Sequence, residues 1–245
     1  MSFRNILLIR MPQVLTNLQK RYHHFNTLAN QPHNLTFTVV KRFAHKTLKC
    51  WQCGIERKNI GELFCEQCSY IQTPPDKDNY FKVFELDEHF DIDQKQLTRK
   101  YRQMQSQLHP DKFTNKSEKE KDISEEFSSL VNKAYNTLQM PLKRAIHLLH
   151  VKGETIEEGQ RIDDPEFLMG IMELNEEVEN ADTDEKLKNL KHKNDNELLK
   201  IAKEIKTCFD ENQITKAKET IIKMKYYNSV SLHINNLMRE KGIVE

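Results

Sequence analysis

The chain has 245 residues, 31% of them charged, with only six glycines and seven prolines, a composition that favours long solvated helices in one to three small domains. The formal net charge of +1 hides an uneven distribution. Residues 1–55 contain no Asp or Glu and carry a net charge of +8, whereas the remaining residues carry a net charge of −7. An acidic main body argues against a general nucleic-acid binder, and no apolar run approaches the roughly 20 residues that a membrane-spanning helix needs.

The first 45 residues have the composition of a targeting segment. Basic residues such as Arg4 and Arg10 interleave with apolar ones such as Phe3 and Leu7. A basic, amphipathic and acid-poor segment is typical of a mitochondrial presequence, so we assign residues 1–45 to one and expect the mature protein in the matrix. The alternative interpretation of this segment is a disordered basic tail. The sequence also leaves open whether part of the protein stays in the cytosol.

Four of the five cysteines form two Cys-x-x-Cys pairs, Cys50 with Cys53 and Cys65 with Cys68. Each pair can bring two thiolates to one ion, and two such knuckles complete a tetrahedral site for a structural Zn²⁺. We therefore expect a small tetracysteine, zinc-ribbon-like domain over residues 46–74, which could also support a homodimer. Iron in place of zinc stays open. Redox dithiols or disulfides are the less favoured alternative, because a matrix protein sits in a reducing compartment.

Periodic apolar segments between residues 80 and 150 predict one small all-α domain. The segments lie at 80–86, 97–108, 127–138 and 141–149. The helix at 97–108 carries an apolar stripe on one side. On the other side lie Arg99 and Arg102, and Lys100 falls between the two faces.

The tripeptide His109-Pro110-Asp111 directly follows this helix. Because a proline disfavours helical geometry in the residue before it, the helix must end near His109. The imidazole and the carboxylate are then exposed on a rigid turn between two helices, which is the layout of a J-domain. A charged face is often only solvated, but one that runs into an exposed turn, with Lys112 beside it, favours a docking surface for an acidic partner.

Residues 163–245 predict an acidic bundle of three helices. Asp164 and Pro165 form a helix start, and two more helices are expected at 184–208 and 213–239. The core stripe of the first helix consists of Phe167, Ile171, Leu174 and Val178. Cys208 is expected to be a buried core thiol.

A second apolar group on the first helix of this bundle points away from its core stripe. Leu168, Met169 and Met172 share their side with Glu173 and Glu176. A wide core is one interpretation of this arrangement. The other is an adaptable, Met-rich protein-binding surface flanked by acids.

Two blocks of the chain together resemble a known family. The segments at 80–84, 108–113, 132–135 and 141–145 look like the J-domain of HscB-type co-chaperones, and the segment that starts at 164–169 looks like that family's C-terminal domain. The resemblance spans roughly residues 80 to 241. It implies a mainly all-α protein: a helical J-domain at 75–151, a linker at 152–162 and a C-terminal three-helix bundle at 163–245, preceded by the tetracysteine domain.

The resemblance also implies a function. HscB proteins deliver an IscU-type iron–sulfur scaffold to a DnaK-type chaperone, stimulate its ATPase and promote cluster transfer to acceptor proteins. The residues expected to contact the chaperone are His109, Pro110, Asp111, Arg99, Lys100, Arg102 and Lys112. The residues expected to contact the scaffold are Leu168, Met169, Met172, Glu173, Glu176 and Tyr226, and Tyr226 rests on the resemblance alone. Gly170 stands where the family often has a glutamate.

Two other functions compete with this one. A general J-protein that delivers unfolded clients would be expected to carry a Gly/Phe-rich linker and a larger β-rich domain, and the sequence shows neither. A zinc-dependent nucleic-acid or redox protein is disfavoured by the acidic main body. We find no catalytic constellation and no phosphate-binding glycine loop, so we expect neither an enzyme nor a nucleotide-binding chain.

Overall fold

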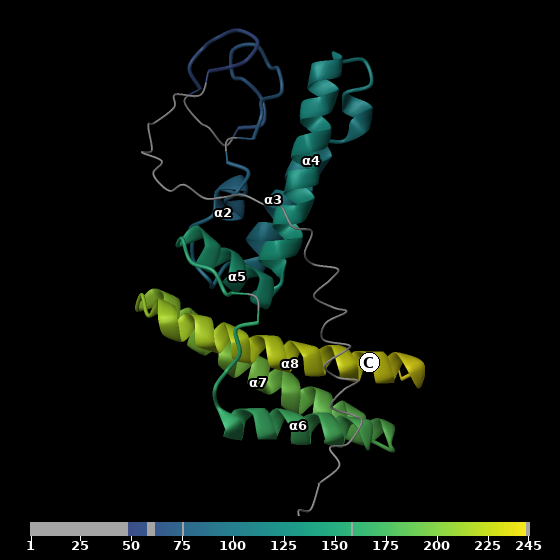
Figure 1. Ribbon diagram of the computed structural model, residues 1–245. Coiled ribbons are helices and arrows are strands. Elements are labelled where there is room, and N and C mark those ends of the chain that lie inside the picture. Colours follow the sequence, from purple (N-terminus) through teal and green to yellow (C-terminus); the bar gives the residue numbers. More distant parts are fainter. Residues whose placement is uncertain (1–48, 58–61, 75, 158, 244–245) are drawn as a thin grey trace, which may run out of the picture. The chain divides into compact units, whose positions relative to one another are not determined.

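The computed structural model describes residues 49–57, 62–74, 76–157 and 159–243, which all belong to one compact unit. The predicted presequence lies outside these residues. The described part is helical, with two isolated antiparallel bridges in place of any strand, so the predicted mainly all-α fold is confirmed (Figure 1). The elements are α2 (Tyr80–Val83), α3 (Gln94–Gln107), the 3₁₀ turn η1 (Pro110–Lys112), α4 (Glu118–Gln139), α5 (Pro141–Val151), α6 (Pro165–Glu179), α7 (Asp184–Asp210) and α8 (Ile214–Glu240).

Helices α2 to α5 form what we call the hairpin domain, in which α3 and α4 pack as an antiparallel pair. Asp93 caps α3, and a reciprocal capping box between Ser117 and Glu120 starts α4. This cap places the start of α4 nine residues before the apolar pattern that predicted it. Phe127, Val131, Ala134 and Leu138 of α4 are all buried in the domain core.

The cysteine module, which we define as residues 49–57 and 62–74, adjoins the hairpin domain. Its two bridges join Lys49 to Glu56 and Phe64 to Ile71, one bridge in each knuckle. Leu63 and Ile71 are buried in the same apolar cluster as the core of the hairpin domain. The second knuckle therefore shares its core with the helices.

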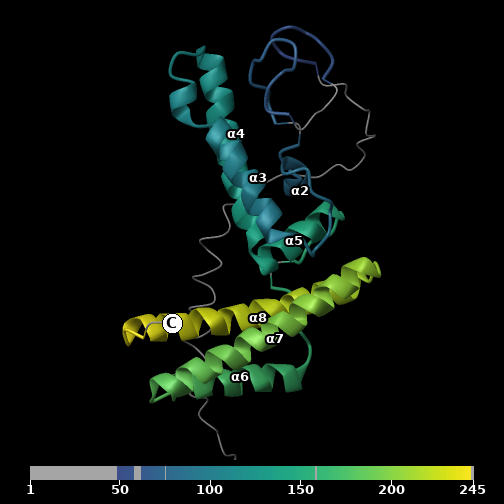
Figure 2. The ribbon, with the colours of Figure 1, turned by 180° about the vertical axis from the view of Figure 1, so that it is seen from behind.

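Helices α6 to α8 form the bundle, and α7 and α8 run side by side over most of their length (Figure 2). Asp164 caps α6 as predicted, and its carboxylate accepts the backbone N–H of Phe167. The buried Asn194 of α7 donates to Ser231 Oγ of α8 at 2.7 Å, so a polar contact joins the two long helices inside the core.

The bundle also contacts the hairpin domain. Ile205 of α7 and Ile221 of α8 belong to the same apolar cluster as the hairpin core. The rings of Phe90 and Phe209 stack with centroids 6.4 Å apart, and Glu154 forms an ion pair with Lys218 of α8. None of the helices in the described part of the chain has the length and apolar character needed to cross a membrane.

Candidate functional site

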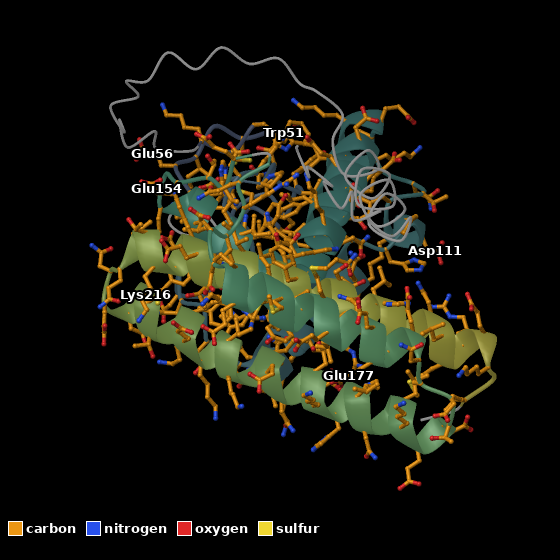
Figure 3. All side chains as sticks on the ribbon, turned by 60° about the horizontal axis from the view of Figure 1, so that its bottom comes forward. Trp51, Glu56, Asp111, Glu154, Glu177 and Lys216 are labelled. Atoms are coloured by element: carbon orange, nitrogen blue, oxygen red, sulfur yellow. The ribbon has the colours of Figure 1, made fainter. Side chains whose placement is uncertain are left out.

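The His-Pro-Asp turn is held by buried neighbours and exposes its own side chains. Leu108 and Phe113, on either side of the turn, are only 1% and 4% exposed. Between them His109 caps η1, because its Nδ1 accepts the backbone N–H of Asp111 at 3.3 Å. The side chains of His109 and Asp111 are 59% and 89% exposed, and that of Asp111 points away from the helices in Figure 3. The turn is thus anchored by its buried neighbours, while the side chains of His109 and Asp111 remain exposed.

The basic side chains around this turn divide into two kinds. Arg99, Arg102 and Lys112 are exposed, as the sequence predicted. Lys100 instead turns inward, where its Nζ donates to the backbone oxygens of Phe84 at 2.7 Å and Glu85 at 3.1 Å. These carbonyls lie at the C-terminal end of α2, where a cation is favoured. Lys100 therefore fastens α2 to α3, a role that its sequence neighbours did not reveal.

The four cysteines of the module converge on one point. Their sulfur atoms all lie within 4.8 Å of one another, with 3.6 Å between the Sγ atoms of Cys50 and Cys68 and 3.7 Å between those of Cys53 and Cys65. Four thiolates at about 2.3 Å from one tetrahedral zinc ion would be about 3.8 Å apart. A disulfide would require about 2.05 Å. The arrangement therefore fits a shared metal ion, and the four cysteines can hold one.

The two knuckles are built alike. Cys50 N–H donates to Ile55 O and Cys65 N–H to Tyr70 O, at 2.8 and 2.9 Å. In each knuckle the residue after the second cysteine has a left-handed backbone, with φ of 74° at Gly54 and 59° at Ser69. This shared geometry turns both thiols of a pair to the same side.

Electrostatics also favour a cation at the sulfur cluster. Although burial alone would raise the pKa of the Cys50 thiol, the backbone N–H groups of Cys53 and Gln52 lower it to about 6. At Cys68 the Tyr70 backbone N–H lowers the pKa, but burial and the neighbouring sulfurs outweigh it and raise the pKa to about 12. The Cys50 thiol therefore ionises readily, while the pKa values of the Cys53 and Cys68 thiols are raised by the neighbouring sulfurs. A bound cation would remove this repulsion, because a metal ligates thiolates.

The sequence did not predict the groups that support the sulfurs. Gln72, only 1% exposed, donates from Nε2 to Cys50 Sγ at 3.3 Å. Trp51 Nε1 donates to Ile71 O at 2.6 Å, and Lys119 Nζ of α4 lies 4.0 Å from the centre of the Trp51 ring. A glutamine or tryptophan near a cysteine pair carries no recognisable pattern, because these contacts depend on how the knuckles fold back on each other.

The third candidate surface lies on α6. Ile171, Leu174 and Val178 are buried as predicted. Phe167 is only half-buried, and its ring meets that of Tyr226 edge-on, with centroids 5.6 Å apart. The fourth member of the predicted core stripe therefore lies at the border of the bundle.

The second group of α6 side chains lies outside the core. Met169 is 61% and Met172 49% exposed, and Glu173 and Glu176 are exposed beside them. Leu168 is half-buried, as is Tyr226 of α8. The exposed fractions of the two methionines exclude the wide-core interpretation for them. Phe167 links this surface to Tyr226, which explains how a residue of α8 comes to lie near α6.

Comparison with known families gives two matches. The DnaJ domain family matches residues 79–147, and the HSCB C-terminal oligomerisation domain family matches residues 163–235. The first match contains the His-Pro-Asp turn, and the second contains the exposed methionines of α6.

Curated proteins similar to this chain include the iron-sulfur cluster co-chaperone protein HscB of Mus musculus, 35% identical over 185 residues, which are 74% of this chain and 79% of that protein. The Homo sapiens protein of the same name is 34% identical over 187 residues, with the same shares covered.

Among solved structures, the crystal structure of human co-chaperone protein HscB superposes with a TM-score of 0.69 at 33% identity, covering 78% of this chain and 98% of that one. Chaperone HscB from Vibrio cholerae gives 0.59 at 28% identity, covering 68% and 99%.

Proposed function

Since this chain belongs to the HscB family of iron–sulfur cluster co-chaperones, we propose that it binds an IscU-type scaffold, stimulates the ATPase of a DnaK-type chaperone and so promotes cluster transfer to acceptor proteins. One observation carries this proposal: a single compact unit offers two exposed surfaces of different chemistry. One is the basic, polar turn at the end of α3, and the other is the Met-rich, acidic face of α6. A protein that couples two partners needs two such surfaces.

The chaperone would contact the turn and the basic face before it. His109, Pro110 and Asp111 present exposed side chains on a backbone held by Leu108 and Phe113, so docking orders few side chains. Arg99, Arg102 and Lys112 would attract an acidic surface. Lys100 would serve the same interface from within, by holding α2 against the helix that carries the arginines.

The scaffold would contact Leu168, Met169, Met172, Glu173, Glu176 and Tyr226. Exposed methionines adapt their shape to a partner and add apolar contact area, and the two acids beside them would select a basic rim on the scaffold. The Phe167 ring that abuts Tyr226 supports this surface from beneath.

Three further parts of the proposal concern the cysteine module and the location of the protein. The ion is Zn²⁺, because a closed set of four thiolates suits a structural zinc site. The ion stabilises the module, which could also join two copies of the chain. The acid-free residues 1–55 support a mitochondrial presequence and a matrix location. The chain itself would hydrolyse no nucleotide.

Replacement of His109 by glutamine tests the proposal. Measured with the DnaK-type chaperone and the scaffold, His109→Gln should abolish ATPase stimulation and keep the helical content and the scaffold affinity, because the His109 side chain is 59% exposed. His89→Gln is the matched control, since His89 is also exposed in the hairpin domain but lies outside the turn. Full stimulation by His109→Gln would refute the assignment of the turn.

A further inference from the structure

A groove of about 410 Å³ lies between the cysteine module and the hairpin domain. Its apolar lining comes from Leu63 and Phe64 of the second knuckle, Val83 and Phe84 of α2, and Met104 of α3. Polar and charged side chains make up the other half of the lining, namely Glu62, Glu85, Lys100, Gln103 and Gln107. Exposed apolar surface rimmed by polar residues commonly marks protein contacts.

The knuckle wall is fastened by the metal-binding residues. Phe64 directly precedes Cys65, and Ile71, with which Phe64 forms a bridge, accepts the Trp51 side-chain N–H at 2.6 Å. Buried Gln72 follows and bonds to Cys50 Sγ. These contacts join the second knuckle to Trp51 and Cys50 of the first. An ion that holds the two knuckles together would therefore also support the position of Phe64 at the groove.

The opposite wall continues into the proposed chaperone-docking face. Gln103 and Gln107 of α3 line the groove. Gln103 follows Arg102 directly and lies one helical turn after Arg99, and Gln107 stands two residues before His109. A partner that covers both the arginines and the turn would also cover the mouth of the groove.

We propose that this groove is an additional docking site for the DnaK-type chaperone, and that the metal-bound cysteine module serves the chaperone contact by supplying its outer wall. The inference rests on the proposed function. The chemistry of the groove calls for an apolar side chain of the chaperone beside the acidic groups that meet Arg99 and Arg102. The tetracysteine site then has a role in partner binding as well as in stability.

The first test replaces Phe64 with alanine, which removes the ring from the groove wall but no metal ligand. The concentration of co-chaperone that gives half-maximal ATPase stimulation should rise roughly tenfold, equivalent to about 1.4 kcal/mol, while maximal stimulation stays the same. Metal content and the fluorescence of Trp51, the one tryptophan of the chain, report whether the module remains folded. Scaffold affinity should not change.

A second variant avoids the module altogether. Gln103→Glu adds a negative charge at the groove from α3, and it should also raise the half-maximal concentration. Gln139→Glu makes the same chemical change at an exposed position at the end of α4 that does not line the groove, and it should have no effect. Because Gln103 also lies beside Arg102, only a shared effect of Phe64→Ala and Gln103→Glu supports the groove.

The outcomes separate this inference from the proposed function. Unchanged half-maximal concentrations in both groove variants, with stimulation abolished by His109→Gln, would overturn the groove proposal alone. Stimulation that survives His109→Gln would overturn the proposed function itself. If the groove variants alter the self-association of the chain in sedimentation and leave chaperone binding intact, a second copy occupies the groove and the proposal is wrong.

Discussion

The Nε2 atom of His147 accepts the backbone N–H of Tyr80 at 3.0 Å, while the two rings stack with centroids 4.2 Å apart. The imidazole of α5 thus satisfies a backbone donor in the first turn of α2, which has no partner within its own helix. His147 is only 8% exposed and must be neutral at Nε2 to accept this bond. Burial, assisted by the nearby His150, lowers the pKa of His147 to about 4.

The stability of the hairpin domain should therefore fall in mild acid. An unfolded histidine has a pKa of about 6.5, so between this pH and about 4 the unfolded chain binds more protons than the folded one. The stabilisation that His147 provides in its neutral form is fully present above pH 6.5. It is lost as the pH falls towards 4, at a cost of roughly 3 kcal/mol. Urea unfolding across this range measures it. His147→Gln should flatten the slope, and His150→Gln should keep most of it, because burial is the larger cause of the shift.

Lys100 and Arg102 should separate stability from docking. Lys100→Ala removes the donors to the Phe84 and Glu85 carbonyls and should destabilise the domain by about 1–3 kcal/mol. Arg102→Ala should change stability by less than about 0.5 kcal/mol, because its side chain is exposed, yet weaken chaperone stimulation. Denaturant unfolding and ATPase titration of both variants decide this. A Lys100→Ala variant as stable as the parent chain would show that Lys100 does not hold α2 against α3.

On α6, the exposed and buried apolar residues should respond in opposite ways. Met169→Ala combined with Met172→Ala should weaken scaffold binding by about 1–3 kcal/mol per residue and leave the melting temperature nearly unchanged. Ile171→Ala, at a neighbouring but buried position, should cost about 2–4 kcal/mol of stability. Calorimetric titration with the scaffold and a thermal melt measure the two effects. A large drop in melting temperature for the methionine pair would place it in the core.

Gly170 offers a stabilising substitution. A Cβ atom at this helical position meets nothing within 4 Å, so Gly170→Ala adds no clash. Alanine favours a helix interior over glycine by up to about 1 kcal/mol, so the free energy of unfolding should rise by about that amount. Denaturant unfolding checks this. Because Gly170 lies among the proposed scaffold contacts, a change in scaffold affinity would show that its flexibility or small size matters for binding.

Metal removal should affect more than the cysteine module. The protein should carry one metal ion per chain, and chelation should unfold the knuckles and release Leu63 and Ile71 from the shared core. The melting temperature of the hairpin domain should then fall, on the order of 5 °C. Trp51 fluorescence and circular dichroism follow the two events. The Cys65→Ser variant should have the lower melting temperature before chelation and show no further shift with chelator. If neither chelation nor Cys65→Ser changes the melting temperature, the module does not share its core with the hairpin domain.

Several elements could be predicted from short-range pattern alone. Pro110 ended the helix before it, Asp164 and Pro165 started α6, and the two Cys-x-x-Cys pairs did converge. These features depend on residues within one or two turns of each other, where steric and capping rules apply directly. The same holds for the side of α6 that carries Met169 and Met172, because helical periodicity fixes which residues share a face.

Helix α8 shows where periodicity fails. Helical periodicity predicts one apolar stripe of Ile214, Ala217, Ile221 and Met224, of which the last three are buried and Ile214 is half-buried. Val230 and Ile234, however, are buried on another side of the helix. Since α8 contacts α5, α6 and α7, no single stripe describes its buried surface. The packing of the neighbouring helices decides which α8 side chains are buried, and the sequence of α8 alone does not show which helices pack against it.

The sequence by itself thus determined the helices, the exposed turn, the thiol set and, through resemblance, the family. Only the tertiary structure decided that Lys100 binds the end of α2, that Gln72 supports Cys50 and that Phe64 and Met104 line one groove. Each of these pairs joins residues 15 or more positions apart. Local patterns record which face of an element is apolar or charged, whereas the partner of a polar or aromatic side chain depends on how distant elements pack.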